Sequence, residues 1–206
     1  MFIELVTRMS KHIDFYWDLG STNTYFALKL ILPIAKTYQA TVRWHPFNLG
    51  YVFRSNNYEL MKEPRDKLNN RLDDLMRWAK KYDLPFQRPT NFPIKTARAL
   101  RGALAMRQWD LELPFINAIF AEYWEQDNGA IGEYPELRRI AVSLGVDADE
   151  FEQASESEPV RQALIDSTER ARAQGVFGAP SIMIGDQLYW GKDRMEFVED
   201  QLAGRS

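Results

Sequence analysis

The fold of this chain is decided by residues 13–25, which read IDFYWDLGSTNTY. The segment from Ile13 to Asp18 is mostly β-branched or aromatic, which predicts a buried strand. Gly20 interrupts this pattern, and the residues after Ser21 have the apolar spacing of a helix. We therefore expect Ser21 at a helix N-terminus, where backbone N–H groups are unpaired and carry a partial positive charge.

A second motif lies near the other end of the chain, at residues 175–181, which read GVFGAPS. It predicts a glycine-rich turn that leads through Ala179 and Pro180 into an apolar strand. We expect the Ala179–Pro180 peptide bond to be cis and to face Ser21, so that the two motifs form one active site. The chain contains no cysteine. Dithiol chemistry is therefore excluded, and a reacting thiol has to come from a small molecule.

Composition excludes several classes of function. The 206 residues have a formal net charge of −3, which argues against nucleic acid as the main partner, because phosphate binding needs a basic surface. No apolar run reaches the roughly 18 residues of a membrane span. With no Cys and two His, we also expect no metal site.

The first ten residues, MFIELVTRMS, do not resemble a signal peptide, because they lack a long apolar region and a small-residue cleavage site. A cytoplasmic protein is the expectation. Translation begins at either Met1 or Met9, and the sequence leaves both alternatives open.

The order of predicted elements is strand, helix, strand, a block of helices, then helix, strand, strand and helix. The predicted strands are residues 12–18, 41–45, 181–184 and 187–190. The predicted helices are residues 24–38, 67–82, 96–109, 114–125, 133–144, 149–154 and 157–174, with a last one starting at 193, whereas 47–61 is expected to be irregular. This order predicts an α/β fold: a thioredoxin-like sheet with a large inserted helical domain. Residues 11–60 and 157–206 would form the thioredoxin-like domain, and residues 61–156 the insertion.

Ser21 has two interpretations. It can simply cap the helix, as serine often does. It can also donate a hydrogen bond to an anion at the same helix end. A thiol with a pKa of about 8.5 is only a few per cent ionised at neutral pH, and helix N-termini lower the pKa of thiols. A role as nucleophile is not favoured, because neither His is placed by the sequence as its base.

The cluster from Trp190 to Arg194 also has two interpretations. Lys192 can be a surface charge and Asp193 an N-cap. Alternatively, backbone N–H groups and Asp193 hold the head group of an α-amino acid, with its carboxylate on the amides and its ammonium on the aspartate. Lys67 lies in a charge-rich helix, and Asn57 in a polar turn, so their sequence context alone predicts solvated residues.

Together these motifs resemble the family of 2-hydroxychromene-2-carboxylate isomerases and kappa-class glutathione transferases, which have a DsbA-like thioredoxin fold. The resemblance covers residues 12–204. The motifs that carry it are DFYWD (14–18) with Ser21 and Tyr25, WHPFNLG (44–50), DLMRWA (74–79), NFP (91–93), YW (123–124), GVFGAP (175–180) and WGKDR (190–194).

The resemblance implies a role for each candidate residue. Ser21 would hydrogen-bond the sulfur of glutathione, and Ala179, before a cis Pro180, would pair its backbone with the cysteinyl part. Lys192 and Asp193 would hold the γ-glutamyl end. Lys67 would approach the glycine carboxylate or the substrate, assisted by Asn57. The resemblance also implies a homodimer.

The chain departs from the family pattern at two positions. Thr22 stands where the family usually has proline, and Lys192 where it usually has Asn or Ser. The predicted function is a glutathione-dependent isomerase acting on a small aromatic carboxylate similar to 2-hydroxychromene-2-carboxylate. The alternatives are a kappa-type transferase that conjugates glutathione to electrophiles, and a non-catalytic glutathione-binding module.

Overall fold

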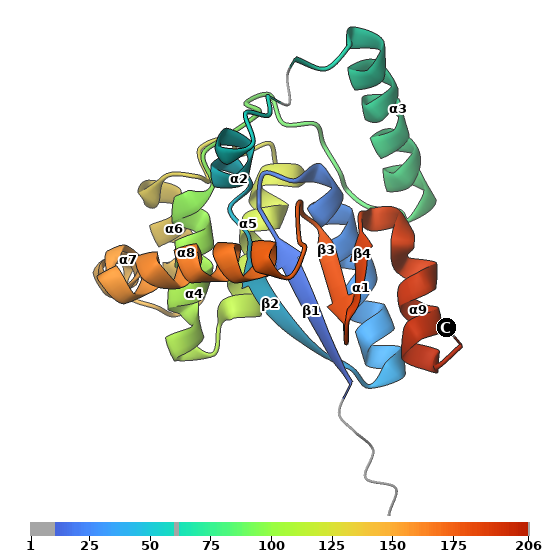
Figure 1. The fold of residues 1–206 in the computed structure, drawn as a ribbon. Coiled ribbons are helices and arrows are strands. Elements are labelled where there is room, and N and C mark those ends of the chain that lie inside the picture. The colour runs from blue at the N-terminus through green and yellow to red at the C-terminus, as the bar shows by residue number, and fades with distance from the viewer. Residues whose placement is uncertain (1–10, 60–61, 206) are drawn as a thin grey trace, which may run out of the picture.

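A computed structural model describes residues 11–59 and 62–205 of the chain. Its centre is a four-stranded sheet in the order β2-β1-β3-β4 (Figure 1). The strands are β1 (His12–Trp17), β2 (Thr41–Pro46), β3 (Ser181–Ile184) and β4 (Gln187–Trp190). β1 runs parallel to β2 and antiparallel to β3, and β3 and β4 form a hairpin. The prediction that both ends of the chain share one sheet is confirmed.

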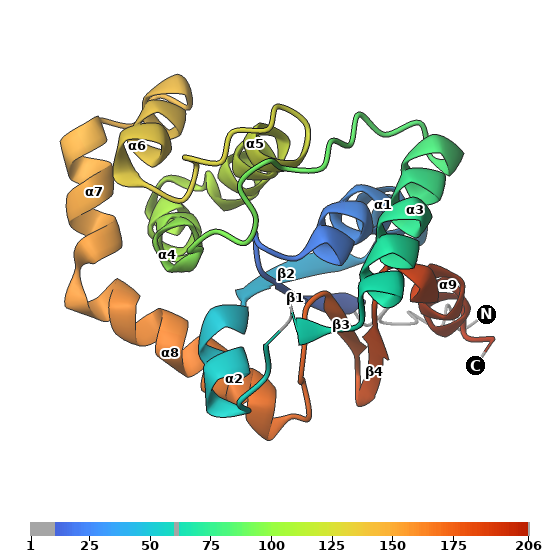
Figure 2. The same cartoon turned by 90° about the horizontal axis from the view of Figure 1, so that it is seen from above.

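The two faces of β1 pack against different helices. Ile13, Phe15 and Trp17 are fully buried in the main core, which they share with α1 (Thr22–Tyr38). Tyr16 points the other way and packs with residues of α8 (Glu158–Ala173) and its C-terminal turn. Figure 2 shows α1 and α8 on opposite sides of the sheet. The sheet is therefore covered on both faces near the end of β1, where the first motif lies.

Most remaining helices lie between β2 and β3 in the sequence. They are α2 (Leu49–Ser55), α3 (Arg65–Lys81), α4 (Ala97–Ala105) continued by a 3-10 turn η2 (Met106–Trp109), α5 (Glu112–Trp124), α6 (Tyr134–Ser143) and α7 (Ala148–Glu156). After β4 follow a second 3-10 turn, η3 (Lys192–Arg194), and α9 (Met195–Ala203). Within the described residues no helix is long and apolar enough to cross a membrane.

Most buried apolar side chains of the sheet and of the helical block belong to one connected cluster, which extends along the chain from Ile13 to Leu202, whereas Tyr16 belongs to a second, smaller cluster. The packing of the larger cluster is tight at Gly102 of α4, where an added Cβ would lie 2.9 Å from the Phe151 ring and 3.0 Å from that of Phe115. In contrast, α3 projects away from the rest of the helical block (Figure 1). The division into a thioredoxin-like domain and an inserted domain stays a prediction.

The segment 47–61 differs from its prediction, because residues 49–55 form a helix rather than an irregular loop. Asn48 caps this helix by accepting a hydrogen bond from the Tyr51 N–H at 3.0 Å, and Val52 is buried beneath it. A helix of two turns has too few apolar positions to show helical periodicity. The only sequence signal for this helix is therefore its N-cap residue, Asn48. Residues 60–61 lie outside the described part.

Candidate active site

Ser21 is the N-cap residue of α1. Its Oγ accepts a hydrogen bond from the Thr24 N–H at 3.2 Å and donates one to the Ala179 carbonyl at 2.8 Å. The helix-cap interpretation is therefore correct, and the hydroxyl also touches the second motif. In the cap the Ser21 oxygen accepts a hydrogen bond, so its O–H can still donate to another group. Capping and a functional role therefore do not exclude each other.

The second motif is folded as predicted. The Ala179–Pro180 peptide bond is cis. Ser181 pairs with Tyr16 of β1, and the Gly191 N–H donates to the Pro180 carbonyl at 3.0 Å. This loop therefore connects three parts of the candidate site: the end of β1, the Ser21 hydroxyl and the turn after β4.

The turn after β4 contains Lys192 and Asp193. Gly191 has φ of 105°, and an added Cβ there would lie 2.8 Å from an Asp193 carboxylate oxygen, so this position requires glycine. Asp193 is exposed and pairs with Arg194 at 2.7 Å. Lys192, in contrast, is buried and points toward α3.

The partners of Lys192 on α3 are a carboxylate and an aromatic ring. Its Nζ lies 3.4 Å from Asp74 Oδ2 and 4.8 Å from the centre of the Trp78 ring. This cation therefore joins the turn after β4 to α3, a contact that the sequence analysis did not predict.

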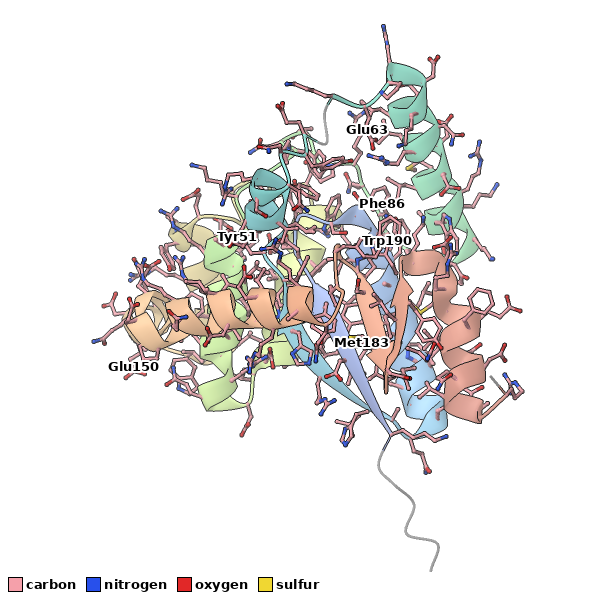
Figure 3. The ribbon with its side chains drawn as sticks, viewed as in Figure 1. Tyr51, Glu63, Phe86, Glu150, Met183 and Trp190 are labelled. Atoms are coloured by element: carbon pink, nitrogen blue, oxygen red, sulfur yellow. The ribbon has the colours of Figure 1, made fainter. Side chains whose placement is uncertain are left out.

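Two predicted residues lie apart from this group. Lys67 pairs with Glu63 at 3.1 Å, and Arg71 binds the same carboxylate. Figure 3 shows Glu63 at the upper end of α3, above Trp190 at the end of β4. Asn57 is exposed, has φ of 50°, and follows α2. The structure thus brings Ser21, Ala179 and Pro180 into contact and leaves Lys67 and Asn57 on surrounding elements.

Asp18 lies in the loop before Ser21 and is not among the residues that the sequence predicts for the site. Only 1% of its surface is exposed. One carboxylate oxygen accepts from the Gly20 N–H at 2.7 Å, and the other accepts from the Leu49 N–H at 2.9 Å and the Thr96 hydroxyl at 3.2 Å. A charged residue that ends a run of buried residues, just before a glycine, was the signal that could have identified it.

Burial also changes the chemistry of Asp18. It raises the pKa of this carboxyl from 3.8 to about 6, because desolvation outweighs the three hydrogen bonds that favour the charged form. The group is therefore mostly ionised at neutral pH but gains its proton in mildly acidic solution. Strongly shifted carboxyls of this kind are concentrated at functional sites.

A pH dependence of stability follows from this shift. The folded chain keeps the Asp18 proton up to a pKa of about 6, whereas the unfolded chain releases it near the ordinary value of 3.8. The stability that the proton gives is fully present at low pH and is lost as the pH rises through about 6. We expect the free energy of unfolding to fall by about 3 kcal/mol from this group between about pH 4 and pH 7.

The measurement is urea unfolding at several pH values for the wild type and Asp18→Asn, whose side chain cannot ionise. The free energy of unfolding of the wild type should decrease relative to that of Asp18→Asn as the pH rises. A difference that is the same at every pH would show that Asp18 does not titrate in this range.

The arrangement is suited to holding an anion. The N-terminus of α1, a helix of 17 residues, presents its partial positive charge beside the Ser21 hydroxyl. The described part of the chain contains no group of three or more His, Cys, Asp or Glu side chains arranged to hold a metal ion. The site can therefore bind and polarise a thiol or a carboxylate with a hydroxyl and backbone N–H groups of its own.

Comparison with known proteins agrees with this geometry. Residues 12–203 match the family model of the DSBA-like thioredoxin domain, which confirms the predicted fold. The 2-hydroxychromene-2-carboxylate isomerase of Sphingobium xenophagum is 30% identical over 94% of this chain and 99% of its own length. Glutathione S-transferase kappa 1 of Caenorhabditis elegans is 25% identical over 92% of this chain and 90% of its own.

A solved structure of a 2-hydroxychromene-2-carboxylate isomerase superposes with a TM-score of 0.81 at 26% identity, covering 94% of this chain and 95% of that one. These relatives confirm the resemblance that the motifs predicted. The chain therefore belongs to the DSBA-like thioredoxin domain family, in which it is an enzyme related to the 2-hydroxychromene-2-carboxylate isomerases and the kappa-class glutathione transferases.

Proposed function

We propose that this protein is a glutathione-dependent isomerase of a small aromatic carboxylate similar to 2-hydroxychromene-2-carboxylate. The observation that carries the proposal is the contact of the Ser21 hydroxyl with the Ala179 carbonyl, 2.8 Å apart, at the N-terminus of α1. This contact puts a hydrogen-bond donor and a helix end beside the backbone of the cis-proline loop. For a peptide-like thiol, the donor and the helix end would stabilise the sulfur, and the loop backbone would hold the peptide part.

The residues around Ser21 fit glutathione. The backbone of Ala179 offers an edge for the cysteinyl part. The cation of Lys192 and the carboxylate of Asp193 complement the carboxylate and ammonium groups of the γ-glutamyl end. When bound, glutathione would supply a thiol whose sulfur adds to a conjugated carbon of the substrate and is eliminated again after ring opening and bond rotation.

The part of Ser21 is to stabilise negative charge on sulfur. Its hydroxyl donates to the Ala179 carbonyl and would turn to donate to the sulfur when that sulfur is ionised, while the oxygen continues to accept from the Thr24 N–H. A hydrogen bond to a charged group is worth about 1.5–3 kcal/mol, which lowers the pKa of a thiol by about one to two units.

Lys67 has a different part in the proposal. Its charge would balance the carboxylate of the substrate or of the glycine end of glutathione, in exchange for its ion pair with Glu63. The proposal also includes Asn57 as a neighbouring contact and a homodimer, both of which follow from the family resemblance. It includes a cytoplasmic location as the expectation from the sequence.

The proposed function is tested by supplying glutathione in a small amount relative to the aromatic carboxylate and following both substrate absorbance and free thiol. We expect many substrate molecules to isomerise for each glutathione, with no loss of thiol. Consumption of one thiol for each substrate molecule would instead show a transferase. Calorimetric binding of glutathione without turnover of any electrophile would show a binding module.

Lys192 allows a separate test. Lys192→Met keeps the length of the side chain but removes its charge, and we expect it to weaken glutathione binding about tenfold, because a charged hydrogen bond is lost. Asp74→Asn is the matched control, because it removes the partner of Lys192 on α3 and leaves the cation in place. Calorimetry at one pH measures both variants. Unchanged affinity in Lys192→Met would show that this lysine only anchors α3.

A further inference from the structure

We propose that Asp18 is a positioning residue of this site: its ionised carboxylate holds the loop that carries Ser21 against α2 and α4. The ligand-binding part of this inference rests on the proposed function, whereas its structural part does not. Asp18 itself touches neither Ser21 Oγ nor Ala179, so its effect has to pass through the backbone of the loop.

The donors to the Asp18 carboxylate come from three separate segments. Gly20 lies directly before Ser21, Leu49 is the first residue of α2, and Thr96 directly precedes α4. One side chain therefore connects three segments that are far apart in the sequence. In addition, the Ser21 N–H donates to the Asp18 carbonyl at 3.1 Å, which closes the turn between the two residues.

All three partners of the Asp18 carboxylate can donate a hydrogen bond. Two are backbone N–H groups, which never accept, and the third is a hydroxyl. An ionised carboxylate only accepts, so it satisfies all three at once. A protonated carboxyl could keep both backbone partners only by donating to the Thr96 oxygen, which can also accept, and an amide would place an N–H against a backbone donor. Accepting from all three donors at once is therefore possible only for the ionised form.

The Asp18 carboxylate has no compensating cation in the described part of the chain. Among residues 11–59 and 62–205, no cation contributes to the pKa of this carboxyl, in which only three hydrogen bonds oppose desolvation. The titratable neighbour that senses Asp18 is Tyr123 of α5, because the Asp18 charge contributes to the raised pKa of that phenol. A buried charge without a cation costs stability at neutral pH, so its presence calls for a role other than stability.

The loop has little room to adopt another position. An added Cβ at Gly20 would lie 3.2 Å from the Thr96 methyl group and 3.3 Å from the Asp18 carboxylate. On the other side of the loop, Trp124 donates from its ring N–H to the Leu19 carbonyl at 2.9 Å. Loss of the Asp18 charge therefore releases Gly20 from one of its few anchors and loosens Ser21.

The first test needs no ligand. Amide NMR of the whole chain should show the Gly20 and Leu49 N–H signals titrating together, with one midpoint near the Asp18 pKa of about 6. Thr96→Val removes one stabilising hydrogen bond and should move that midpoint to higher pH, whereas Thr96→Ser keeps the hydroxyl and should restore it. Two amides that do not titrate, or that titrate separately, would overturn the proposal.

The second test measures binding of S-methylglutathione, which has no thiol to ionise. If only the chain with ionised Asp18 binds, affinity should be about tenfold weaker at about pH 5 than at about pH 8. Thr96→Val should shift this pH profile to higher pH, as it shifts the amide midpoint. Asp18→Asn should abolish the change of affinity with pH.

The two tests separate this inference from the proposed function. Absence of S-methylglutathione binding at about pH 8 would contradict the glutathione site, while the amide titration would still decide whether Asp18 holds the loop. Amides that titrate together while affinity stays constant with pH would show a carboxylate that is structural only, and would overturn the positioning role.

Discussion

Ser21→Ala is expected to lower turnover about 10- to 100-fold while the chain stays folded. The reason is the loss of one hydrogen bond to a charged sulfur, worth about 1.5–3 kcal/mol, with each 1.4 kcal/mol giving about a factor of ten. The same substitution removes the cap on Thr24 and should cost about 1 kcal/mol of stability. The measurement is kcat/KM at saturating glutathione, combined with thermal unfolding.

The matched control is Thr22→Ala, which removes a hydroxyl from the next residue of the same helix. We expect it to retain most of the activity. Ser21→Cys should not create an efficient dithiol enzyme, because Thr24 stands where a second cysteine would be needed. Equal activity of Ser21→Ala and wild type would leave Ser21 as a helix cap alone.

Trp124→Ala should have the largest effect on stability. The side chain is 1% exposed, packs against Phe86, Phe92 and Tyr123, and donates to the Leu19 carbonyl in the site loop. Deleting a buried tryptophan costs about 3–5 kcal/mol. Trp124→Phe keeps an aromatic ring but leaves that carbonyl without its donor, and should cost about 1–3 kcal/mol.

Urea unfolding measures both Trp124 variants. Trp190→Phe is the comparison, because this tryptophan is half exposed, and its free energy of unfolding should change by less than about 1 kcal/mol. If Trp124→Phe were as stable as the wild type, the bond from α5 to the site loop would have no energetic role.

The elements that could be predicted from the sequence are those with local signals. The strand before Gly20, the helix after Ser21 and the hairpin at Gly185 all follow from period and turn chemistry over a few residues. The contact between Ser21 and Ala179 depends on residues far apart, and it was predicted because the motifs resemble a known family. The fold and the centre of the site could therefore be predicted from the sequence.

The parts that could not be predicted depend on distant partners. Asp18 is recognisable as a charged residue at the end of a buried strand, but no pattern around it shows that Leu49 and Thr96 converge on it. In the same way, Lys192 turns toward Asp74, a residue more than a hundred positions away. The helix at 49–55 is too short to show a period, and the second cis proline, Pro93, has no glycine-rich turn before it.

The central claim is that Ser21 stabilises a thiolate that belongs to glutathione. It is tested most directly by titrating bound glutathione with pH and following thiolate formation by ultraviolet absorbance, in the wild type and in Ser21→Ala. We expect the bound thiol to ionise about one to two pH units lower in the wild type than in the variant. Titration of both proteins at the same pH would contradict the claim.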